Sequence, residues 1–206
     1  AQTHHDQASA IWEKMGDLYG LLYGLINLGL LHNEMKQPDE ALIYLEQAFQ
    51  QAEIGKEEIA IGKVYVNIGV AYRLKGVPAQ AEEYGRRAEE IFRDHSHLHG
   101  LAEVWGNLGL ACVDQKKWAE AGSYLSASLE TWRALSNEYG ELKTLLYMIE
   151  VDLAQGNYAQ AIVRINDLDQ RHGRDTWQKR YPQLTELLNK HRRSLSEKTA
   201  GQAAAS

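Results

Sequence analysis

The chain has 206 residues, a formal net charge of −6 and an apolar fraction of 44%, values that fit a soluble globular protein or a short solenoid. No apolar run approaches the ~18 residues that a membrane-spanning helix needs, and the first residues show no signal-peptide pattern. Residues 171–206 hold eight Lys and Arg against three Asp and Glu, whereas the rest of the chain is acidic. The single cysteine, Cys112, cannot form a disulfide within the chain, so we expect a reducing, cytoplasmic setting.

The predicted helices repeat with a period of 40 residues. Asn27, Asn67 and Asn107 are each followed two residues later by a glycine, within apolar stretches whose spacing is typical of helices. In the first unit the pattern predicts one helix over roughly 18–35 and a second over roughly 39–54, with the turn-forming letters KQPD between them. We therefore interpret each unit as a helix A, a short turn and a helix B.

A glycine recurs in helix A of the first three units, at Gly29, Gly69 and Gly109. Glycine inside a helix costs about 1 kcal/mol relative to alanine, so three glycines in register need a compensating gain. We predict that each glycine lets helix B of its own unit approach closely, through the alanine twelve residues later. In the fourth unit Ile149 takes the place of the glycine, and we expect that pair of helices to open slightly.

These positions resemble the tetratricopeptide repeat, whose pattern is W-x₂-L-G-x₂-Y followed by A-x₃-F. The matching residues are Tyr65, Ile68, Gly69 and Tyr72 in the second unit, Trp105, Leu108 and Gly109 in the third, and the pairs Ala41 with Leu45, Ala121 with Leu125 and Ala161 with Ile165. The period exceeds the usual length of about 34 residues and resembles the repeats of kinesin light chains, spindle-orientation scaffolds and bacterial signalling ATPases and regulators. The resemblance implies an all-α, right-handed superhelical solenoid of antiparallel helix pairs.

The period also sets the predicted boundaries. They are a partial repeat with helix B alone at 1–17, repeats at 18–57, 58–97 and 98–137, a degenerate fourth repeat at 138–175, a capping helix at 176–195 and a disordered tail at 196–206. Because no helix A precedes the partial repeat, an apolar edge that contains Trp12 stays uncovered. We predict that a second copy of the chain covers this edge in a two-fold homodimer; the alternative is that tail residues fold back over it.

Candidate catalytic and metal-binding residues are few. His95, His97 and His99 alternate at a junction between units, and only His95 and His99 have the i, i+4 spacing of metal ligands on a helix. We interpret this stretch as an inter-repeat loop, with a metal site as the alternative. Cys112 stands where the family pattern has tyrosine, and we expect it to be buried rather than reactive. Since no phosphate loop, nucleophile elbow or spaced carboxylate pair is present, we expect no enzyme, cofactor or metal.

By the family's pattern, the A helices line the inner wall of the superhelix. The candidate partner-binding residues on this wall are Tyr23, Ile26, Asn27, Leu30, Lys63, Val66, Asn67, Val70, Arg73, Asn107 and Leu110. The same pattern adds Asn33, Glu103, Gly106, Val113, Leu146, Tyr147 and Glu150 to the wall. The wall is more apolar than a solvated surface, which is typical of a groove for a peptide strand or an amphipathic helix. The alternative is that the superhelix itself buries part of it.

The repeated asparagines form a ladder along this wall. A side-chain amide both donates and accepts hydrogen bonds, so the ladder can hold an extended peptide; a role in the repeat consensus is the alternative. We predict a scaffold that binds protein or peptide, and we expect neither a membrane nor a nucleic acid as partner. The alternative function is a ligand- or peptide-sensing regulatory module of a larger bacterial signalling or transcription-regulating protein.

Overall fold

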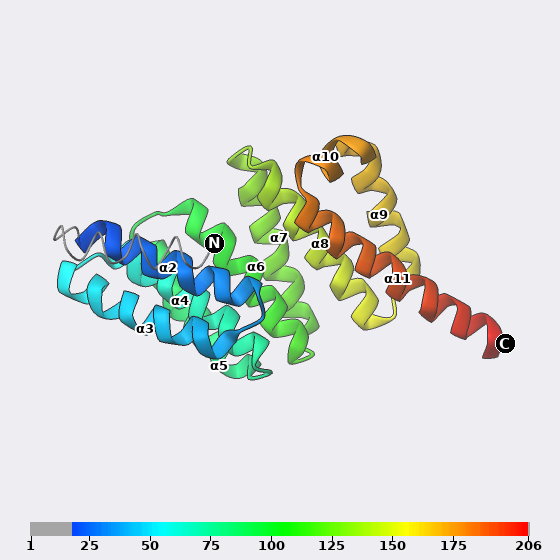
Figure 1. Ribbon diagram of the computed structural model, residues 1–206. Helices are drawn as coiled ribbons and strands as arrows, with labels where there is room; N and C mark the ends of the chain where they lie inside the picture. Colours follow the sequence, from blue (N-terminus) through cyan, green and yellow to red (C-terminus); the bar gives the residue numbers. More distant parts are fainter. Residues whose placement is uncertain (1–17, 206) are drawn as a thin grey trace.

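The computed structural model describes residues 18–205, and within this range it contains ten helices and no strand. Four helix pairs follow one another along the chain (Figure 1). The A helices are α2 (Leu18–Glu34), α4 (Glu58–Leu74), α6 (Leu98–Asp114) and α8 (Glu138–Gln155), and the B helices are α3 (Pro38–Gly55), α5 (Pro78–Asp94), α7 (Trp118–Ala134) and α9 (Tyr158–His172). A short helix, α10 (Arg174–Arg180), and a long helix, α11 (Pro182–Ala205), follow them. The predicted all-α solenoid with a 40-residue period is confirmed.

The turns between the helices share one backbone conformation. Each turn between successive helices from α2 to α9 contains a residue with a positive φ between 51° and 76°. These residues stand 20 positions apart: Lys36, Lys56, Gly76, Ser96, Lys116, Ser136 and Gly156. Glycine adopts this left-handed conformation without steric cost, whereas lysine and serine are strained by it. Pro38 and Pro78 begin two of the B helices, at a position whose N–H has no helical partner.

The A helices form the inner layer of the stack. Each A helix packs on its own B helix and also on the A helix of the next unit. Among the described helices, the B helices make no comparable contact with one another. Because neighbouring A helices therefore lie closer together than neighbouring B helices, the stack curves with its concave side on the A layer.

The three repeated glycines lie against helix B of their own units, as predicted. The distances from an added Cβ to the nearest atom of helix B would be 2.5 Å at Gly29 (Leu45 Cγ), 3.1 Å at Gly69 (Ala81 O) and 2.7 Å at Gly109 (Leu125 Cγ). The expected alanine makes the approach in the second unit, whereas in the first and third units a buried leucine fills the space beside the glycine. The close approach that these glycines allow is confirmed.

The fourth helix pair is more open, as predicted. Ile149 stands at the glycine position of α8 and is fully buried, and α8 and α9 pack less closely than the helices of the other pairs. The distance between packed helices follows the side chains at their contact. Arg164 Nε donates to Asp152 Oδ2 at 2.7 Å across this pair, so an ion pair links the two helices.

The C-terminal end differs from the prediction in two respects. The additional short helix α10 precedes the capping helix, and α11 continues to Ala205, through the residues that were expected to form a disordered tail. Alanine, lysine, glutamate and glutamine make up much of this tail and favour helix, so α11 propagates beyond its packed turns. The packed part of α11 lies mainly on α8 (Figure 1), and Trp177, Leu184 and Leu188 are buried there.

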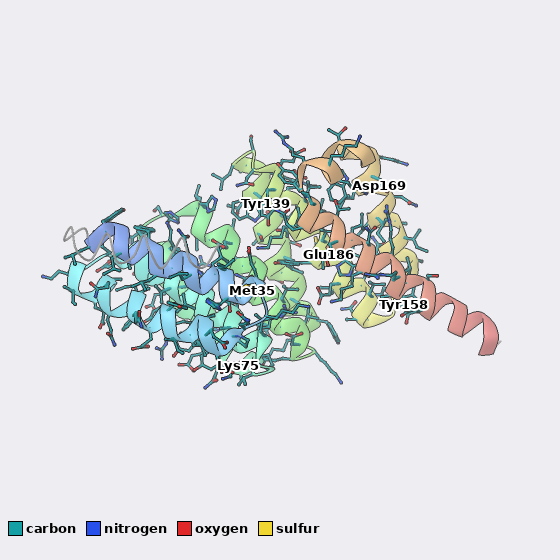
Figure 2. The ribbon with its side chains drawn as sticks, viewed as in Figure 1. Met35, Lys75, Tyr139, Tyr158, Asp169 and Glu186 are labelled. Carbon is teal, nitrogen blue, oxygen red and sulfur yellow. The ribbon has the colours of Figure 1, made fainter. Side chains whose placement is uncertain are left out.

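An aromatic contact and an ion pair hold this cap on both helices of the fourth unit. Tyr139 lies at the start of α8 (Figure 2). Its ring meets that of Tyr181 edge-on, with 5.4 Å between the ring centroids. Arg192 of α11 donates to Asp169 of α9 at 2.5 Å. The cap therefore continues the stack past its last repeat, as solenoids require.

The N-terminal partial repeat at 1–17 lies outside the described residues. The homodimer through that edge, with its Trp12, therefore stays a prediction. Within the described range, no helix combines the length and the apolarity needed to cross a membrane.

Candidate functional site

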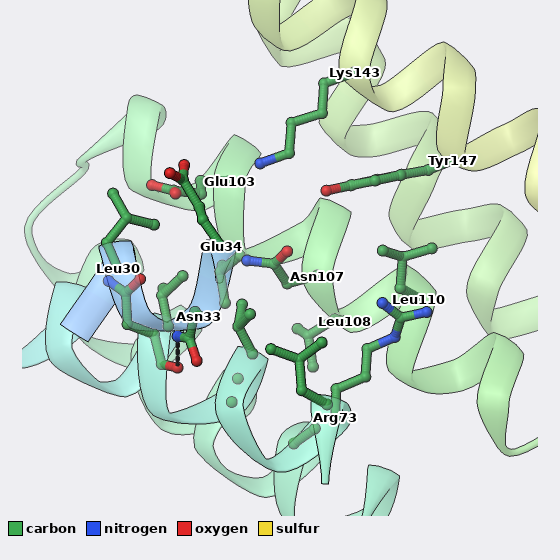
Figure 3. Close-up of a pocket in the computed structure, with 18 residues that line it drawn as sticks. Leu30, Asn33, Glu34, Arg73, Glu103, Asn107, Leu108, Leu110, Lys143 and Tyr147 are labelled. Atoms are coloured by element: carbon green, nitrogen blue, oxygen red, sulfur yellow. Dashed lines mark hydrogen bonds between the residues drawn. The ribbon is translucent and has the colours of Figure 1, made fainter. Parts of the chain in front are cut away.

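A cavity of about 210 Å³ lies on the concave layer, where the four A helices converge (Figure 3). We call this cavity the groove. Its lining residues are Leu30, Asn33 and Glu34 of α2; Val66, Asn67, Gly69, Val70, Arg73 and Leu74 of α4; Ala81 and Gly85 of α5; Glu103, Val104, Asn107, Leu108 and Leu110 of α6; and Lys143 and Tyr147 of α8. The groove thus brings together residues that occupy equivalent positions of successive 40-residue repeats.

Glycine shapes the floor of the groove at α5. Gly85 stands where the repeat pattern has a large residue, and Leu108 of the next unit occupies the space instead. A Cβ at Gly85 would stand 2.6 Å from Leu108 Cδ2, closer than real Cβ contacts allow. This departure from the family pattern lets Leu108 pack directly against α5, and the contact joins the second and third units beneath the groove.

Asparagine side chains link α2 to α4 at the wall of the groove. Asn33 Nδ2 donates to the main-chain oxygen of Asn67 at 2.9 Å, and Asn67 Nδ2 donates to the main-chain oxygen of Lys63 at 2.9 Å. Asn33 is 4% exposed, and within the described structure its Oδ1 has no hydrogen-bond partner. A buried acceptor without a hydrogen-bond partner lowers the stability of the protein by roughly 1–3 kcal/mol. A ligand that donates a hydrogen bond to Asn33 Oδ1 would remove this cost.

Arg73 braces three A helices at one end of the groove. Its Nε donates to Asp114 Oδ2 of α6 at 2.7 Å, and its guanidinium lies 3.6 Å from Glu150 Oε1 of α8. Two carboxylates therefore neutralise this guanidinium. Arg73 fixes the spacing of the helices rather than offering an open site for an anion.

Lys143 supplies the positive charge that remains in the groove. Its ammonium lies 5.8 Å from the centroid of the Tyr147 ring, and Figure 3 shows the amine and the Tyr147 hydroxyl pointing into the same hollow toward Asn107. Tyr147 raises the pKa of Lys143; burial opposes this effect, and Glu103 adds to it. Lys143 is therefore charged at neutral pH, and among the described residues it has no ion pair within 4 Å.

The groove contains seven of the eleven residues that the sequence predicted for partner binding: Leu30, Val66, Asn67, Val70, Arg73, Asn107 and Leu110. The other four do not border it. Ile26 is 5% exposed and belongs to the core between α2, α3 and α4. Asn27 is exposed on α2, and the ammonium of Lys63 lies 5.0 Å from the ring centroid of Tyr23. These four residues lie nearer the N-terminal ends of α2 and α4, away from the hollow.

Two charged residues of the groove, Glu34 and Lys143, were absent both from the eleven candidates and from the wider set of predicted wall residues. The repeat does contain a signal for Lys143. Lys63 and Glu103 occupy the same repeat position 80 and 40 residues earlier, and both are charged. The signal at Glu34 is weaker, because its counterparts are the apolar Leu74 in the second unit and the acidic Asp114 in the third.

The histidines of the stretch HSHLHG have structural roles at the junction between α5 and α6. His97 is the N-cap of α6, and its Nδ1 accepts a hydrogen bond from the main-chain N–H of Gly100 at 2.9 Å. His95 is the C-cap of α5, and the His99 ring meets Trp132 edge-on with 4.7 Å between centroids. The interpretation as an inter-repeat loop is confirmed for His95 and His97, whereas His99 lies in the first turn of α6.

Glu82, Cys112 and Glu120 bring three potential metal-ligand atoms within 4.8 Å of one another. Burial raises the pKa of the Cys112 thiol to about 11, so the thiol keeps its proton. Burial would also raise the pKa of Glu82, but hydrogen bonds from Lys117 and Arg86 outweigh it and lower the pKa to about 2. With two cations already bound to Glu82, this cluster fits a structural ion-pair network, and Cys112 is buried as predicted.

Comparison with known proteins agrees with the geometry of the helix pairs. Residues 21–94 match the family model described as "Tetratricopeptide repeat". Over this segment the sequence is therefore similar to tetratricopeptide repeats. The matched segment covers α2 to α5, and the same pairing continues through α9 at the same period.

The chain is also similar to two known proteins, one in sequence and one in fold. Over 82 residues, 40% of the chain, the sequence is 29% identical to "Regulatory protein AfsR" of Streptomyces coelicolor, and the match spans 8% of that protein. In three dimensions, 95% of the chain matches 83% of the chain in "Crystal Structure of the Apo Form of RapI", with a TM-score of 0.68 and 14% identity. At that identity, the second likeness shows a shared helical-repeat fold alone.

Proposed function

We propose that the groove binds an extended peptide segment of a partner protein. The observation that carries this proposal is the groove itself, a predominantly apolar hollow of about 210 Å³ on the concave layer of a helical-repeat stack. Binding sites are usually concave and apolar with a few convergent polar groups. Extended peptides add main-chain hydrogen bonds to such contacts.

The polar groups of the groove suit a peptide main chain. The amide of Asn107 is both donor and acceptor, and the charged Lys143 is a donor. The buried Oδ1 of Asn33 is an acceptor, and Asn67 keeps its own Oδ1 after donating through Nδ2. The asparagine hypothesis therefore includes Asn33 and excludes Asn27, which lies outside the groove.

Asn107→Ala is expected to weaken peptide binding by up to about tenfold, because one hydrogen bond to the ligand contributes roughly 0.5–1.5 kcal/mol. Asn67→Ala is expected to act in the same direction. The melting temperature should hardly change, since Asn107 is a half-buried side chain at the groove wall. The probe is an octapeptide selected from a random displayed library on the immobilised chain, then synthesised and titrated by fluorescence anisotropy.

Asn166→Ala provides the matched control, because Asn166 is exposed on α9, away from the groove. This substitution should leave the affinity for the octapeptide unchanged. If Asn107→Ala and Asn67→Ala instead lower the melting temperature and spare binding, the asparagines are structural. If the library yields no enriched peptide, the proposed function is wrong.

A regulatory role is the second candidate, and the likeness to "Regulatory protein AfsR" favours it. In this case the peptide-binding repeats form a sensing module whose occupancy controls another domain of a larger polypeptide. The sequence of the whole gene product tests this candidate. An ATPase or DNA-binding domain in the same polypeptide is the expected finding, and a gene product made of helical repeats alone would contradict it.

A further inference from the structure

Gly106 is the exception at a repeat position that otherwise carries a large apolar side chain. Its counterparts at intervals of 40 residues are Ile26, Val66 and Leu146, and all three are buried. The repeated glycines of the A helices have no room for a Cβ. At Gly106 an added Cβ would meet its nearest neighbour, Ser128 Oγ, at 3.5 Å, an ordinary van der Waals distance.

The missing side chain leaves a second cavity of about 100 Å³, which we call the Gly106 pocket. Its lining residues are His99, Ala102, Glu103, Gly106, Asn107, Ser128, Trp132, Asn137, Tyr139, Gly140, Lys143, Thr144 and Tyr147. The rings of Trp132, Tyr139 and Tyr147 give it aromatic walls. The pocket therefore offers apolar surface on several sides of one small space.

The hydroxyl groups of Ser128 and Thr144 in the Gly106 pocket have hydrogen-bond partners within the protein. Ser128 Oγ donates to the main-chain oxygen of Ala102 at 2.7 Å. Thr144 Oγ1 donates to the main-chain oxygen of Gly140 at 2.9 Å, and the two hydroxyl oxygens are 3.2 Å apart. Because these two groups are satisfied, an apolar occupant can enter without leaving either of them unpaired.

The mouth of the Gly106 pocket belongs to the groove as well. Glu103, Asn107, Lys143 and Tyr147 line both cavities. The ammonium of Lys143 and the carboxylate of Glu103 give this shared mouth one positive and one negative charge, so a neutral dipole complements it better than a net charge. A peptide unit is such a dipole, with a carbonyl for Lys143 and an N–H for Glu103.

We propose that the Gly106 pocket admits one aliphatic side chain, Leu, Ile, Val or Met, of the peptide that occupies the groove. This inference rests on the proposed function and specifies the chemistry of the ligand. A cavity of 150 Å³ in an apolar protein core is known to hold a benzene molecule, so about 100 Å³ selects an aliphatic side chain over the rings of Phe, Tyr or Trp. The peptide unit of the same residue lies at the charged mouth.

A random octapeptide library selected in parallel on the wild-type chain and on Gly106→Leu tests this inference. Gly106→Leu places in the pocket the side chain that Leu146 carries at the equivalent position of α8, and it also removes a helix-interior glycine. Peptides enriched on the wild type should share one aliphatic position. One such peptide, synthesised, should bind Gly106→Leu roughly ten- to a hundredfold more weakly, the range expected when an aliphatic side chain loses its pocket.

Three controls keep the outcome decisive. Gly106→Ala adds one methyl group that the pocket can hold, so it should change the affinity less than Gly106→Leu does. If thermal melts show that Gly106→Leu is unfolded, Gly106→Val, whose smaller side chain fills the pocket partly, is used in its place. Replacing the aliphatic residue of the peptide by glycine should weaken binding to the wild type and have little effect on Gly106→Leu.

The outcomes separate this inference from the proposed function. If selected peptides bind the wild type and Gly106→Leu equally, or share no aliphatic position, the side-chain pocket is wrong and peptide binding in the groove stands. If free leucine at millimolar concentration displaces the octapeptide, the pocket recognises a free amino acid and the inference is overturned. If no peptide is enriched on either protein, the proposed function and this inference both fail.

Discussion

Replacing Gly109 with leucine is expected to lower the free energy of unfolding by about 3 kcal/mol, the upper part of the range for overpacked cores. A Cβ at Gly109 would stand 2.7 Å from Leu125 Cγ and 2.8 Å from Leu125 Cδ2. Leu125 is 1% exposed, so the close-packed core around it restricts its movement. The rest of the leucine side chain would therefore force α6 and α7 apart. Urea denaturation followed by circular dichroism measures the change.

Gly122→Ala is the control for this substitution. Gly122 lies within α7, and a Cβ there would meet nothing within 4 Å. We expect it to raise the free energy of unfolding by up to about 1 kcal/mol through helix propensity. If Gly109→Leu changes the free energy of unfolding by no more than about 0.5 kcal/mol, as substitutions at ordinary surface sites do, the close-packing explanation of the repeated glycines is wrong.

Acidification from pH 7 to pH 4.5 is expected to destabilise the C-terminal cap by about 2–3 kcal/mol through His191. This side chain is 3% exposed, and within the described structure its Nε2 has no hydrogen-bond partner. Burial lowers the pKa of His191 from 6.5 to about 4; the neighbouring Lys190 adds to the effect, and a hydrogen bond to the main chain of Leu146 opposes it. The unfolded chain therefore binds the proton more readily than the folded one.

The sign of this effect follows from the lowered pKa. The contribution of the neutral, buried imidazole to stability is fully present above the unfolded pKa of 6.5, and it is lost as the pH falls through 6.5 toward 4. Urea denaturation at pH 7 and at pH 4.5 measures the loss. His191→Gln cannot take up a proton, so it should lose less stability than the wild type over the same interval.

His97 contributes in the same direction, because burial also lowers its pKa. Because the wild type and His191→Gln both contain His97, the contribution of His97 drops out of the difference between their losses of stability. Equal losses of stability in the two proteins would contradict the assignment to His191.

The sequence predicted the repeat architecture because small residues at fixed spacing can only be explained by close packing. Gly29, Gly69 and Gly109 predicted the approach of helix B, and Ile149 predicted the more open fourth pair. The left-handed turn residues were not predicted, because Lys36 and Ser96 do not favour that conformation. The turn geometry is imposed by the packing of the helices on either side, which a local sequence pattern does not contain.

The groove was predicted in part, for a similar reason. The period identifies which positions face the concave side, so Val66, Asn67 and Asn107 were found from sequence. It does not say where the curvature of the stack brings these positions together, and so Ile26 and Asn27 were included although they border no hollow. The Gly106 pocket was not predicted, because its walls come from Trp132 and Tyr139 on other helices, and only their packing makes a cavity.

Amide chemical-shift mapping of the 23.3 kDa chain with the selected octapeptide tests the central claim most directly. The groove on the A layer competes with a shallow hollow of about 450 Å³ on the outer side of α5 and α7, lined in part by Tyr124. If the groove is the binding site, the largest shift changes fall on α4, α6 and α8, around Asn67, Asn107 and Lys143. Shift changes concentrated on α5 and α7 around Tyr124, with the A helices unaffected, would contradict it.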